Sequence, residues 1–444
     1  MCIDPNTPPP SSRVTRRGVM AAAAVLAGGT ALSGAVTGTA AAAGNTAGER
    51  GAAGGGSGRP PRGGTLIIDG GTLLDPLTGR TTEDAVVVIE DGIVRAAGTR
   101  RETRQDVAAV RGRAKTIRAN GRWVLPGLVD AHIHLSTLTD AHRAISLGAT
   151  SVRSGSTAFY QDIALRELAR WNPQRVPRMR AAGVFVTPKP GDTVLADPDL
   201  APLALLKDGV RTPEALRRLV QVNLSRGADV IKTRVNERAG SPTENPLTQV
   251  YDREQLSATV AAARRGGAGV LCHSYSEKGI HDAVMAGVAS IEHGVYMGER
   301  TMHEMRRRGT YFTPTLAAMA SLAADPDPIL AERGRLFLPI ARRAVRRAFE
   351  LGVPVAAGTD SFGGAIDPIG REIELMREAG LPALDAIRTA TTGAARLIGL
   401  QRTAGRLARG FRGDAVLVDG DPLRDVSVLK APAAVISHGF TVEP

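Results

Sequence analysis

Two histidines separated by a single residue, His132 and His134, end an apolar run that begins at Leu128. The Pro126-Gly127 pair ahead of the run is typical of a turn that leads into a strand. Side chains at positions i and i+2 of a strand point to the same face. Both imidazoles would therefore leave one strand end together. Such a pair can bind a metal ion or be structural, and the pair alone favours neither.

Four further polar residues stand near the ends of apolar runs downstream: Lys232, His273, His293 and Asp360. Taken singly, each has an ordinary explanation. His273 could be a core histidine, and an aspartate after Gly-Thr commonly caps a turn. A lysine that follows Val-Ile is unusual in a core, because a buried ammonium needs a partner. Together with the two histidines, this set favours a metal centre over six separate structural roles.

The elements that must position these residues are short apolar strands that alternate with helical stretches, as in a parallel α/β sheet or barrel. From the histidine pair onward the pattern predicts eight strand–helix units. We expect a (β/α)8 TIM-like barrel with its working residues at the carboxyl ends of the strands. The predicted strands cover residues 128–135, 151–155, 179–186, 229–235, 269–275, 289–293, 311–316 and 353–360, and the predicted helices cover 141–148, 163–171, 213–226, 252–265, 278–286, 300–308, 371–379 and 382–397. A long Pro-rich loop is predicted over residues 187–208, and a helical insertion before residue 353.

Short β-runs punctuated by Gly-containing turns flank the predicted barrel on both sides. We expect them to form one small β-sandwich domain from both chain ends, over residues 64–124 plus 405–444. The barrel would then occupy residues 125–404, and the fold class would be α/β. The runs lie at residues 65–69, 85–90, 93–97, 414–420 and 434–437.

Residues 1–43 predict an export signal. Thr15–Met20 (Thr-Arg-Arg-Gly-Val-Met) is a twin-arginine signature, and Ala40–Ala43 offers small-residue cleavage sites. The Gly-rich residues 44–63 predict a disordered linker. The twin-arginine route carries folded proteins, so the expected location is periplasmic, cell-surface or extracellular, with any metal loaded before export.

The formal net charge of +12 raises the question of a nucleic-acid partner. The arginines are scattered over predicted helix faces, and aromatic residues are only 3% of the chain, too few for base-stacking platforms. We therefore expect a solvated basic surface and no nucleic acid. We also expect no membrane span in the processed chain, and the sequence leaves room for a homo-oligomer.

Six segments carry a resemblance to a known family. From about residue 65 onward the chain resembles the amidohydrolase superfamily, metal-dependent hydrolases on a distorted eight-fold barrel. The resemblance is greatest to its imidazolonepropionase-like and prolidase-like branch. The segments are Leu125–His134, Gly227–Lys232, His273, Ser290–Gly294, Gly358–Asp360 and Ile387–Leu400.

The resemblance implies a site for two divalent metal ions, with zinc expected and manganese or iron as alternatives. By this resemblance, His132, His134 and Asp360 bind one ion, and His273 and His293 bind the other. It also implies that a hydroxide bridges the two ions and attacks the substrate. Asp360 would accept the proton of this nucleophile and pass it to the leaving nitrogen.

The resemblance further implies that Lys232 reacts with carbon dioxide and bridges both ions as a carbamate. Simple electrostatics agrees with this role. An unmodified ammonium between two dications would be repelled, whereas a neutral amine can capture carbon dioxide.

Two further residues are candidates for contact with the substrate. Arg234 lies two positions beyond Lys232, and Tyr275 lies two positions beyond His273. Arg234 could bind a substrate carboxylate and Tyr275 could donate to the carbonyl oxygen, or both could be ordinary loop residues. The branch often has Arg-Asp after its second strand, where this chain has Arg153-Ser154.

The sequence thus predicts an exported binuclear metal-dependent amidohydrolase that cleaves an amide or peptide C–N bond in a small molecule or dipeptide. A dipeptidase-like, prolidase-like or cyclic-amide substrate is expected. One alternative is a mononuclear deaminase or imidazolonepropionase-like hydrolase. Another is an inactive, metal-stabilised binding protein of the cell surface.

Overall fold

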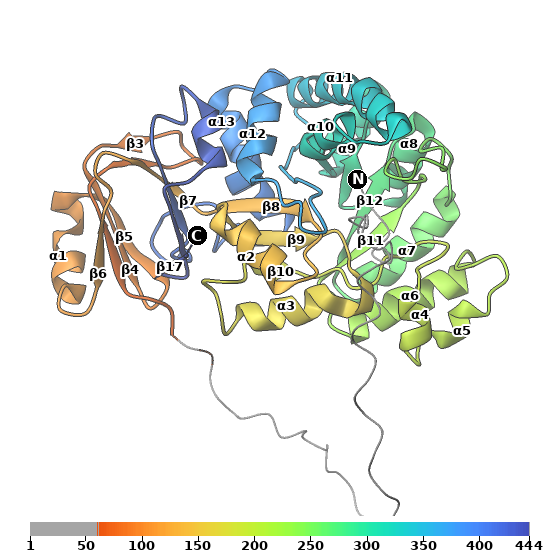
Figure 1. Ribbon diagram of the computed structural model, residues 1–444, viewed down its shortest axis with the longest axis horizontal. Coiled ribbons are helices and arrows are strands. Elements are labelled where there is room, and N and C mark those ends of the chain that lie inside the picture. The colour runs from red at the N-terminus through yellow and green to blue at the C-terminus, as the bar shows by residue number, and fades with distance from the viewer. Residues whose placement is uncertain (1–59, 61, 444) are drawn as a thin grey trace, which may run out of the picture. The chain divides into compact units, whose positions relative to one another are not determined.

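The computed structural model describes residue 60 and residues 62–443 (Figure 1). The predicted signal peptide lies outside the described residues, as does the predicted linker except for residues 60, 62 and 63. Within the described part of the chain, no helix is both long and apolar enough to cross a membrane.

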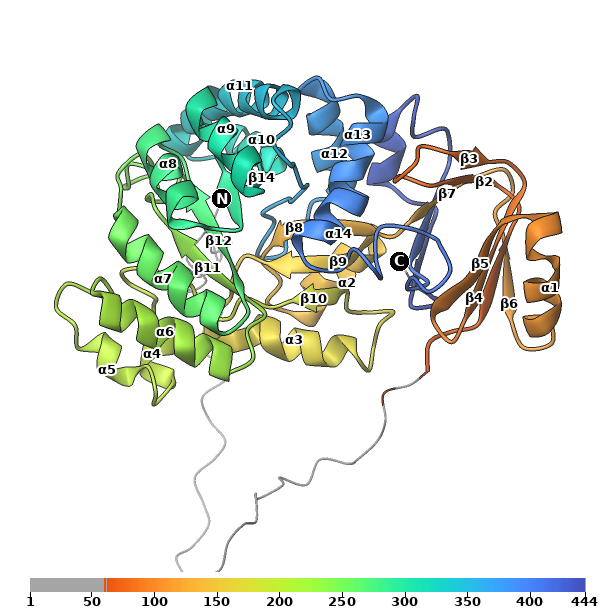
Figure 2. The ribbon, with the colours of Figure 1, turned by 180° about the vertical axis from the view of Figure 1, so that it is seen from behind.

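The parallel strands β8 to β14 form two sheets, seen from both sides in Figures 1 and 2. One sheet has the order β10-β9-β8 and the other β11-β12-β13-β14, and every neighbouring pair is parallel. Parallel pairing brings the carboxyl ends of neighbouring strands to the same edge of a sheet. The strands are β8 (Leu128–Ile133), β9 (Ala149–Ser154), β10 (Arg178–Arg180), β11 (Val230–Arg234), β12 (Gly269–Ser274), β13 (Ser290–His293) and β14 (Tyr311–Thr313).

The chain that follows β10 connects the first sheet to the second. Val186 bridges Thr233 in parallel, and the backbone N–H of Val186 donates to the carbonyl of Lys232 over 2.9 Å. The predicted third strand is regular only over β10. Gly183 has a left-handed φ of 67°, which interrupts an extended ladder.

The chain that follows α11 (Pro328–Glu350) connects the opposite edges of the two sheets. Phe312 of β14 bridges Val355, and the backbone N–H of Ala131 in β8 donates to the carbonyl of Ala357 over 2.8 Å. The predicted eighth strand is therefore a single bridge. Pro354 has no N–H with which to extend a ladder.

The predicted helices are present, with ends that shift by a few residues. Asp252 and Gln255 form a reciprocal capping box at the start of α7, and Thr212 caps α6 ahead of Pro213. The helices are α2 (Leu138–Ser146), α3 (Gln161–Ala169), α6 (Pro213–Ser225), α7 (Arg253–Arg265), α8 (Glu277–Ala286), α9 (Glu299–Arg308), α12 (Ile369–Glu378), α13 (Ala383–Arg388) and α14 (Ala394–Leu397).

Shorter elements occupy the connections. The predicted loop over residues 187–208 contains two short helices, and a π-helical turn divides the last predicted helix into α13 and α14. The predicted helical insertion consists of α10 and α11. These further elements are η1 (Ala158–Tyr160), α4 (Thr193–Ala196), α5 (Ala201–Ala204), α10 (Leu316–Ala323), η2 (Thr389–Gly393) and η3 (Val426–Lys430).

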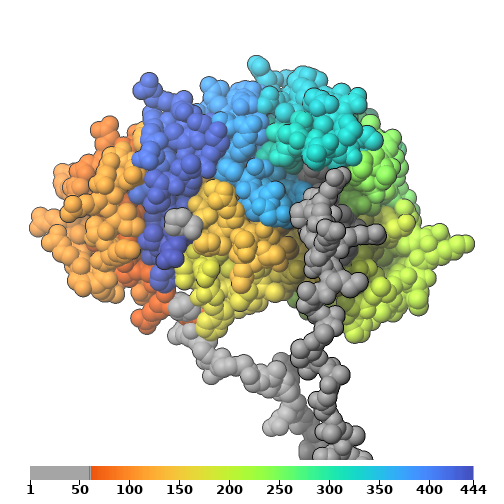
Figure 3. All heavy atoms as spheres, viewed as in Figure 1, coloured from red at the N-terminus to blue at the C-terminus, as the bar shows by residue number. Residues whose placement is uncertain are grey.

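Strands from the two ends of the described chain meet in one sheet of order β17-β16-β15-β7-β2-β3. Leu125 of β7 pairs antiparallel with Val416 of β15, and Figure 3 shows the C-terminal segments in dark blue beside the orange N-terminal strands. A second sheet has the order β5-β4-β1-β6. One hydrophobic cluster includes Leu66 and Val87 of this sheet and Leu417 of the other. The strands are β1 (Leu66–Asp69), β2 (Thr72–Leu74), β3 (Thr81–Thr82), β4 (Ala85–Glu90), β5 (Ile93–Thr99), β6 (Lys115–Arg118), β7 (Trp123–Pro126), β15 (Ala415–Val418), β16 (Ala434–Ser437) and β17 (Phe440–Thr441).

The stretch that contains the histidine pair is divided at Gly127. β7 ends at Pro126 and joins the C-terminal strands, whereas β8 begins at Leu128 and joins the parallel sheet. A Cβ at Gly127 would lie 2.2 Å from Oγ1 of Thr150 and 2.9 Å from Cβ of Asp414. Only glycine fits where the chain passes from one sheet to the other.

Helix α1 (Arg100–Val110) is an element that the sequence pattern does not predict. Its residues are mostly polar, and only Thr103 and Val110 are buried. The apolar periodicity is therefore weak. The local signal is the capping box that Thr99 forms with Glu102.

Candidate metal centre

The two histidines of the His-x-His pair lie at the carboxyl end of β8 and face Asp360. Nε2 of His132 lies 3.3 Å from Oδ1 of Asp360, and Nε2 of His134 lies 3.0 Å from the same oxygen. The backbone N–H of Asp360 donates to the carbonyl of His132 over 2.7 Å. Asp360 has a left-handed φ of 56°, an uncommon conformation of the kind that clusters at functional sites.

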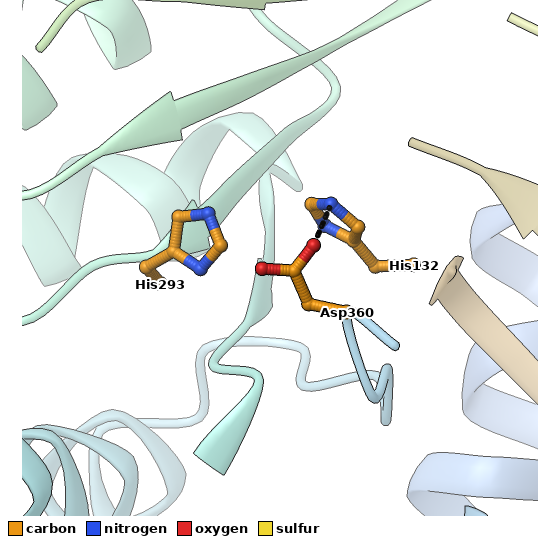
Figure 4. A group of neighbouring side chains, drawn as sticks. All are labelled: His132, His293 and Asp360. Carbon is orange, nitrogen blue, oxygen red and sulfur yellow. Dashed lines mark ion pairs between the residues drawn. The ribbon is translucent and has the colours of Figure 1, made fainter. Parts of the chain in front are cut away.

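His273 and His293 form the other side of the cluster. Their ring centroids lie 4.5 Å apart, and the ring of His293 lies 5.5 Å from that of His132. Figure 4 shows the carboxylate of Asp360 between the imidazoles of His132 and His293. One potential ligand atom from each of these three residues lies within 4.8 Å of the other two, a spacing that suits a shared ion.

Lys232 lies among these imidazoles. Its side chain is fully buried on β11, and its Nζ lies 3.0 Å from Nε2 of His132. The six residues that the sequence nominates as ligands therefore gather at the carboxyl ends of β8, β11, β12 and β13 and in the chain after α11.

A local backbone turn brings His293 into the cluster. Consecutive residues of a strand point to opposite faces, yet both Glu292 and His293 are fully buried and both lie within reach of His132. His293 has a left-handed φ of 69°, which ends the alternation of β13. The strained backbone thus allows the side chains of two successive residues to face His132.

Each of the four imidazoles has one ring nitrogen within hydrogen-bond distance of a protein group. The other nitrogen of His273, Nδ1, is buried and has no hydrogen-bond partner among the described residues. An imidazole held at one nitrogen, with its second nitrogen turned toward carboxylate and imidazole neighbours, is how proteins present histidine to a metal. The donor set therefore fits divalent metal ions. The contacts are His132 Nδ1 to Glu292 Oε2 (2.6 Å), His134 Nδ1 to the Ser156 carbonyl (2.8 Å), His273 Nε2 to the Glu237 carbonyl (3.0 Å) and His293 Nδ1 to Thr315 Oγ1 (2.7 Å).

The electrostatics of the site keeps the imidazoles neutral. Burial lowers the pKa of all four histidines, and the charge of Lys232 lowers each pKa further. The pKa of His134 falls to about 3. Neutral imidazole is the form that binds a metal, so the cluster is ready for metal ions without first losing protons.

The two candidate substrate residues lie beside the second histidine pair. Arg234 is opposite His273 in the β11–β12 register and is buried. Its Nη1 donates to Oε2 of Glu237 over 2.6 Å, and its Nε has no hydrogen-bond partner among the described residues. The ring of Tyr275 stacks on His293, with centroids 5.2 Å apart and an interplanar angle of 12°.

Glu292 and Arg153 contact the site, and the sequence analysis did not assign them a role there. Glu292 lies one position before a predicted ligand, and Arg153 lies in the middle of the second predicted strand. The available signal is that each is a charged residue inside a predicted barrel strand, where charged side chains are rare unless paired. The structure pairs them with each other at 3.1 Å.

Comparison with known proteins agrees with this geometry. The Amidohydrolase family matches residues 123–442, so the chain belongs to that family. It is 30% identical to ochratoxinase of Aspergillus niger over 236 residues, which are 52% of this chain and 48% of that protein. The chain therefore matches about half the length of this relative.

Solved structures resemble nearly the whole described chain. A Xaa-Pro dipeptidase with bound methionine is 25% identical, with a TM-score of 0.73 over 86% of this chain and 100% of the other. A prolidase in complex with N-methylphosphonate-L-proline is 25% identical, with a TM-score of 0.71 over 85% and 99%. These neighbours imply a TIM-like barrel fold with mixed α/β content.

Proposed function

We propose that this protein is a binuclear metal-dependent amidohydrolase that cleaves an amide or peptide C–N bond. The observation that carries the proposal is the position of Lys232. Its side chain is fully buried, and its Nζ lies 3.0 Å from Nε2 of His132, a predicted metal ligand. A residue at that point can bridge two ions if it carries a carboxylate.

The carboxylate would come from carbon dioxide. The amine nitrogen of Lys232 forms a bond to the carbon of carbon dioxide and releases one proton to solvent, which leaves a carbamate with two oxygens. His132, His134 and Asp360 would then hold one ion and His273 and His293 the other. When bound, such ions make a bound water nucleophilic at neutral pH and polarise a carbonyl.

Asp360 would move the proton. Its Oδ1 lies within 3.3 Å of Nε2 of both histidines of the first pair, so the carboxylate would be within reach of a water held by an ion at these residues. It would accept the proton of that water and deliver it to the leaving nitrogen as the C–N bond breaks. The hydrogen bond from its backbone N–H to His132 fixes this position.

The substrate we propose carries a carboxylate next to the scissile bond, as a dipeptide or N-acyl amino acid does. Arg234 would bind that carboxylate through Nε, because Glu237 already occupies Nη1. Tyr275, which stacks on His293, would donate to the carbonyl oxygen. The prolidase bound to a proline analogue and the Xaa-Pro dipeptidase support a dipeptide that ends in proline.

We also propose that the parallel strands close into a barrel and that the two chain ends form a β-sandwich. The hydrogen bonds of Val186 to β11 and of Ala131 to residue 357 support a closed (β/α)8 barrel. The antiparallel pairing of β7 with β15 supports a β-sandwich built from both chain ends.

Export by the twin-arginine route also belongs to the proposal, on the evidence of the N-terminal sequence alone. Replacing Arg16 and Arg17 together with lysine should retain the protein in the cytoplasm. Unimpaired export of that variant would contradict the route.

The proposed function is tested by metal content and hydrolysis measured on the same samples. Protein loaded with zinc or manganese is analysed for metal per chain and assayed with dipeptides ending in proline, N-acyl amino acids, cyclic amides and ochratoxin. We expect two equivalents of metal and hydrolysis of at least one class. Lys232→Ala should lose metal and activity, and acetate or propionate should restore part of both by replacing the carbamate. Lys278→Ala is a matched control, because that lysine is exposed and pairs only at the surface.

Other outcomes identify the alternatives. One equivalent of metal with no effect of Lys232→Ala would favour a mononuclear deaminase or imidazolonepropionase-like hydrolase. Two equivalents with no hydrolysis of any class would favour a metal-stabilised binding protein.

A further inference from the structure

We infer that Arg153 and Glu292 form a buried positioning pair that orients His132 as a metal ligand. The inference rests on the proposed metal site and adds two residues to it. Neither residue is predicted to touch a metal or the substrate, so both would act through His132.

The contact with His132 is direct. Oε2 of Glu292 lies 2.6 Å from Nδ1 of His132, and both side chains are fully buried. A carboxylate at that distance accepts the Nδ1–H and thereby places the lone pair of the ring on Nε2. Nε2 is the atom that faces Nζ of Lys232 at 3.0 Å and Oδ1 of Asp360 at 3.3 Å. The hydrogen bond therefore selects the tautomer that presents a ligand nitrogen to the site.

Arg153 holds the carboxylate in this orientation. Its Nη2 donates to both oxygens of Glu292 over 3.1 and 3.2 Å. The same guanidinium donates from Nε to the carbonyl of Ala131 over 2.6 Å and from Nη1 to Ser290 over 2.9 Å. Ala131 immediately precedes His132, so Arg153 fixes both the strand that carries the histidine and the carboxylate that orients it.

The burial of this pair argues against a purely structural role. Arg153 is 2% exposed and Glu292 is fully buried. A buried ion pair stabilises a fold weakly, because removing two charges from water offsets most of their attraction. The pair would instead serve to orient His132 as a metal ligand. Outer-shell partners of metal-bound histidines typically contribute about 10- to 100-fold to metal affinity.

Zinc affinity, measured by competition with a chelating dye, tests the inference without an activity assay. Glu292→Gln should weaken zinc binding about 10- to 100-fold. Asp197→Asn is the matched control, because Asp197 is also buried and its carboxylate also pairs with an arginine, Arg226, over 2.7 Å. The control should bind zinc as the unsubstituted protein does. Equal affinity for Glu292→Gln and unsubstituted protein would overturn the inference, whereas an absence of zinc binding in both would overturn the proposed function as well.

Chemical rescue distinguishes loss of the guanidinium that orients Glu292 from a general loss of the folded structure. Arg153 lines a cavity of about 250 Å³ together with Arg180, Asp229 and Ala289, so a small cation can enter from the amino ends of the strands. In Arg153→Ala, millimolar guanidinium should recover most of the lost zinc affinity, and urea at the same concentration should not. No recovery with guanidinium would show that Arg153 does not position Glu292.

A measurement on the unsubstituted protein does not depend on how Glu292→Gln or Arg153→Ala folds. Long-range ¹H–¹⁵N correlation on metal-free protein with ¹⁵N-histidine reports the tautomer of each ring, and His132→Gln assigns the signal. We expect His132 to carry its proton on Nδ1. A proton on Nε2 would overturn the inference.

Discussion

The two histidine pairs of the candidate metal centre are supported in different ways. His132 is oriented by a carboxylate that a buried guanidinium holds, and that carboxylate is 160 residues away in sequence. His273 and His293 are oriented by neutral groups, the carbonyl of Glu237 and the hydroxyl of Thr315. His132 thus depends on charged side chains inside the strands, whereas its neighbour His134, held by the carbonyl of Ser156, and the second pair depend on the connections that follow the strands.

The difference concerns how tightly each pair is held. Hydrogen bonds to charged groups are stronger than those between neutral groups, and strands shift less than the connections that follow them. We therefore expect His132 to keep a nearly fixed geometry, and the second pair to adjust as substrate binds. Substitution of the groups that orient His132 should therefore lower metal affinity more than substitution of the groups that orient the second pair.

Removal of the metal should have the largest effect, because both histidine pairs then lose their ion. A ligand that binds only the folded state stabilises it by an amount that rises with the ratio of ligand concentration to Kd, about 4 kcal/mol at a thousandfold excess over Kd. Chelation should abolish hydrolysis and lower the Tm by several degrees. Calorimetry of loaded and chelated protein checks this, and identical Tm values would contradict a bound metal.

Gly155→Ala should damage the first pair selectively. A Cβ at Gly155 would lie 2.5 Å from Nε2 of His134 and 2.9 Å from Cδ2 of His132, so both rings must move. A shift of about 1 Å at reacting groups can cost about 100-fold in rate. Metal content should fall from two equivalents to one or none, with at least that loss of activity.

Gly112→Ala is the control for that substitution, because a Cβ there meets no atom within 4 Å. It should leave metal content and rate unchanged. If Gly155→Ala behaved like Gly112→Ala, the crowding around the first pair would have no functional consequence.

Thr315→Val should have a smaller effect, confined to the second pair. It removes the hydroxyl that lies 2.7 Å from Nδ1 of His293 but leaves no buried charge unpaired. We expect at most about a tenfold loss of zinc affinity, below that of Glu292→Gln. Thr315→Ser keeps the hydroxyl and should restore the affinity. A larger loss for Thr315→Val than for Glu292→Gln would reverse the order that we assign to the two pairs.

The smallest effect on zinc affinity is expected at Glu372, which holds the backbone next to Thr315. Glu372 is fully buried and accepts the backbone N–H groups of Leu316 and Ala317, the first residues of α10. Burial raises the pKa of Glu372 from its ordinary 4.5 to about 8. Between these values the folded state binds more protons than the unfolded state, so this contribution to stability is present below pH 4.5 and is lost as the pH rises toward 8.

Glu372→Gln should flatten that dependence. The Tm of the unsubstituted protein should fall more steeply between pH 5 and pH 8 than the Tm of the variant, with similar values near pH 5. Zinc affinity at pH 7 should change less than in Thr315→Val. Parallel Tm curves would show that Glu372 does not titrate in this range.

The six candidate ligands could be predicted because of a regular relation between sequence and geometry. His132 and His134 are two positions apart on a strand, and Lys232, His273 and His293 each lie near the end of an apolar run. Parallel strands bring such ends together, so six residues could be expected at one place. The structure does place them there, while their roles as ligands stay predictions.

Other features could not be anticipated in this way. The third and eighth predicted strands are mostly irregular, because Gly183 and Pro354 interrupt their ladders. Helix α1 lacks the apolar periodicity on which the analysis depends. The left-handed backbone of His293 and Asp360 also has no local signature, because it is imposed by the contacts around each residue.

By itself the sequence determined which residue types stand at the strand ends, because the period of two along a strand and the alternation with helices are properties of short segments. Only the tertiary structure decided what lies behind each ligand. The pairing of Arg153 with Glu292, and of Glu292 with His132, joins β13 to two strands, β8 and β9, whose paired residues lie 160 and 139 residues earlier in the chain. The physical reason is that a buried charge takes its partner from whichever strand packing brings within reach, and packing is a property of the whole fold.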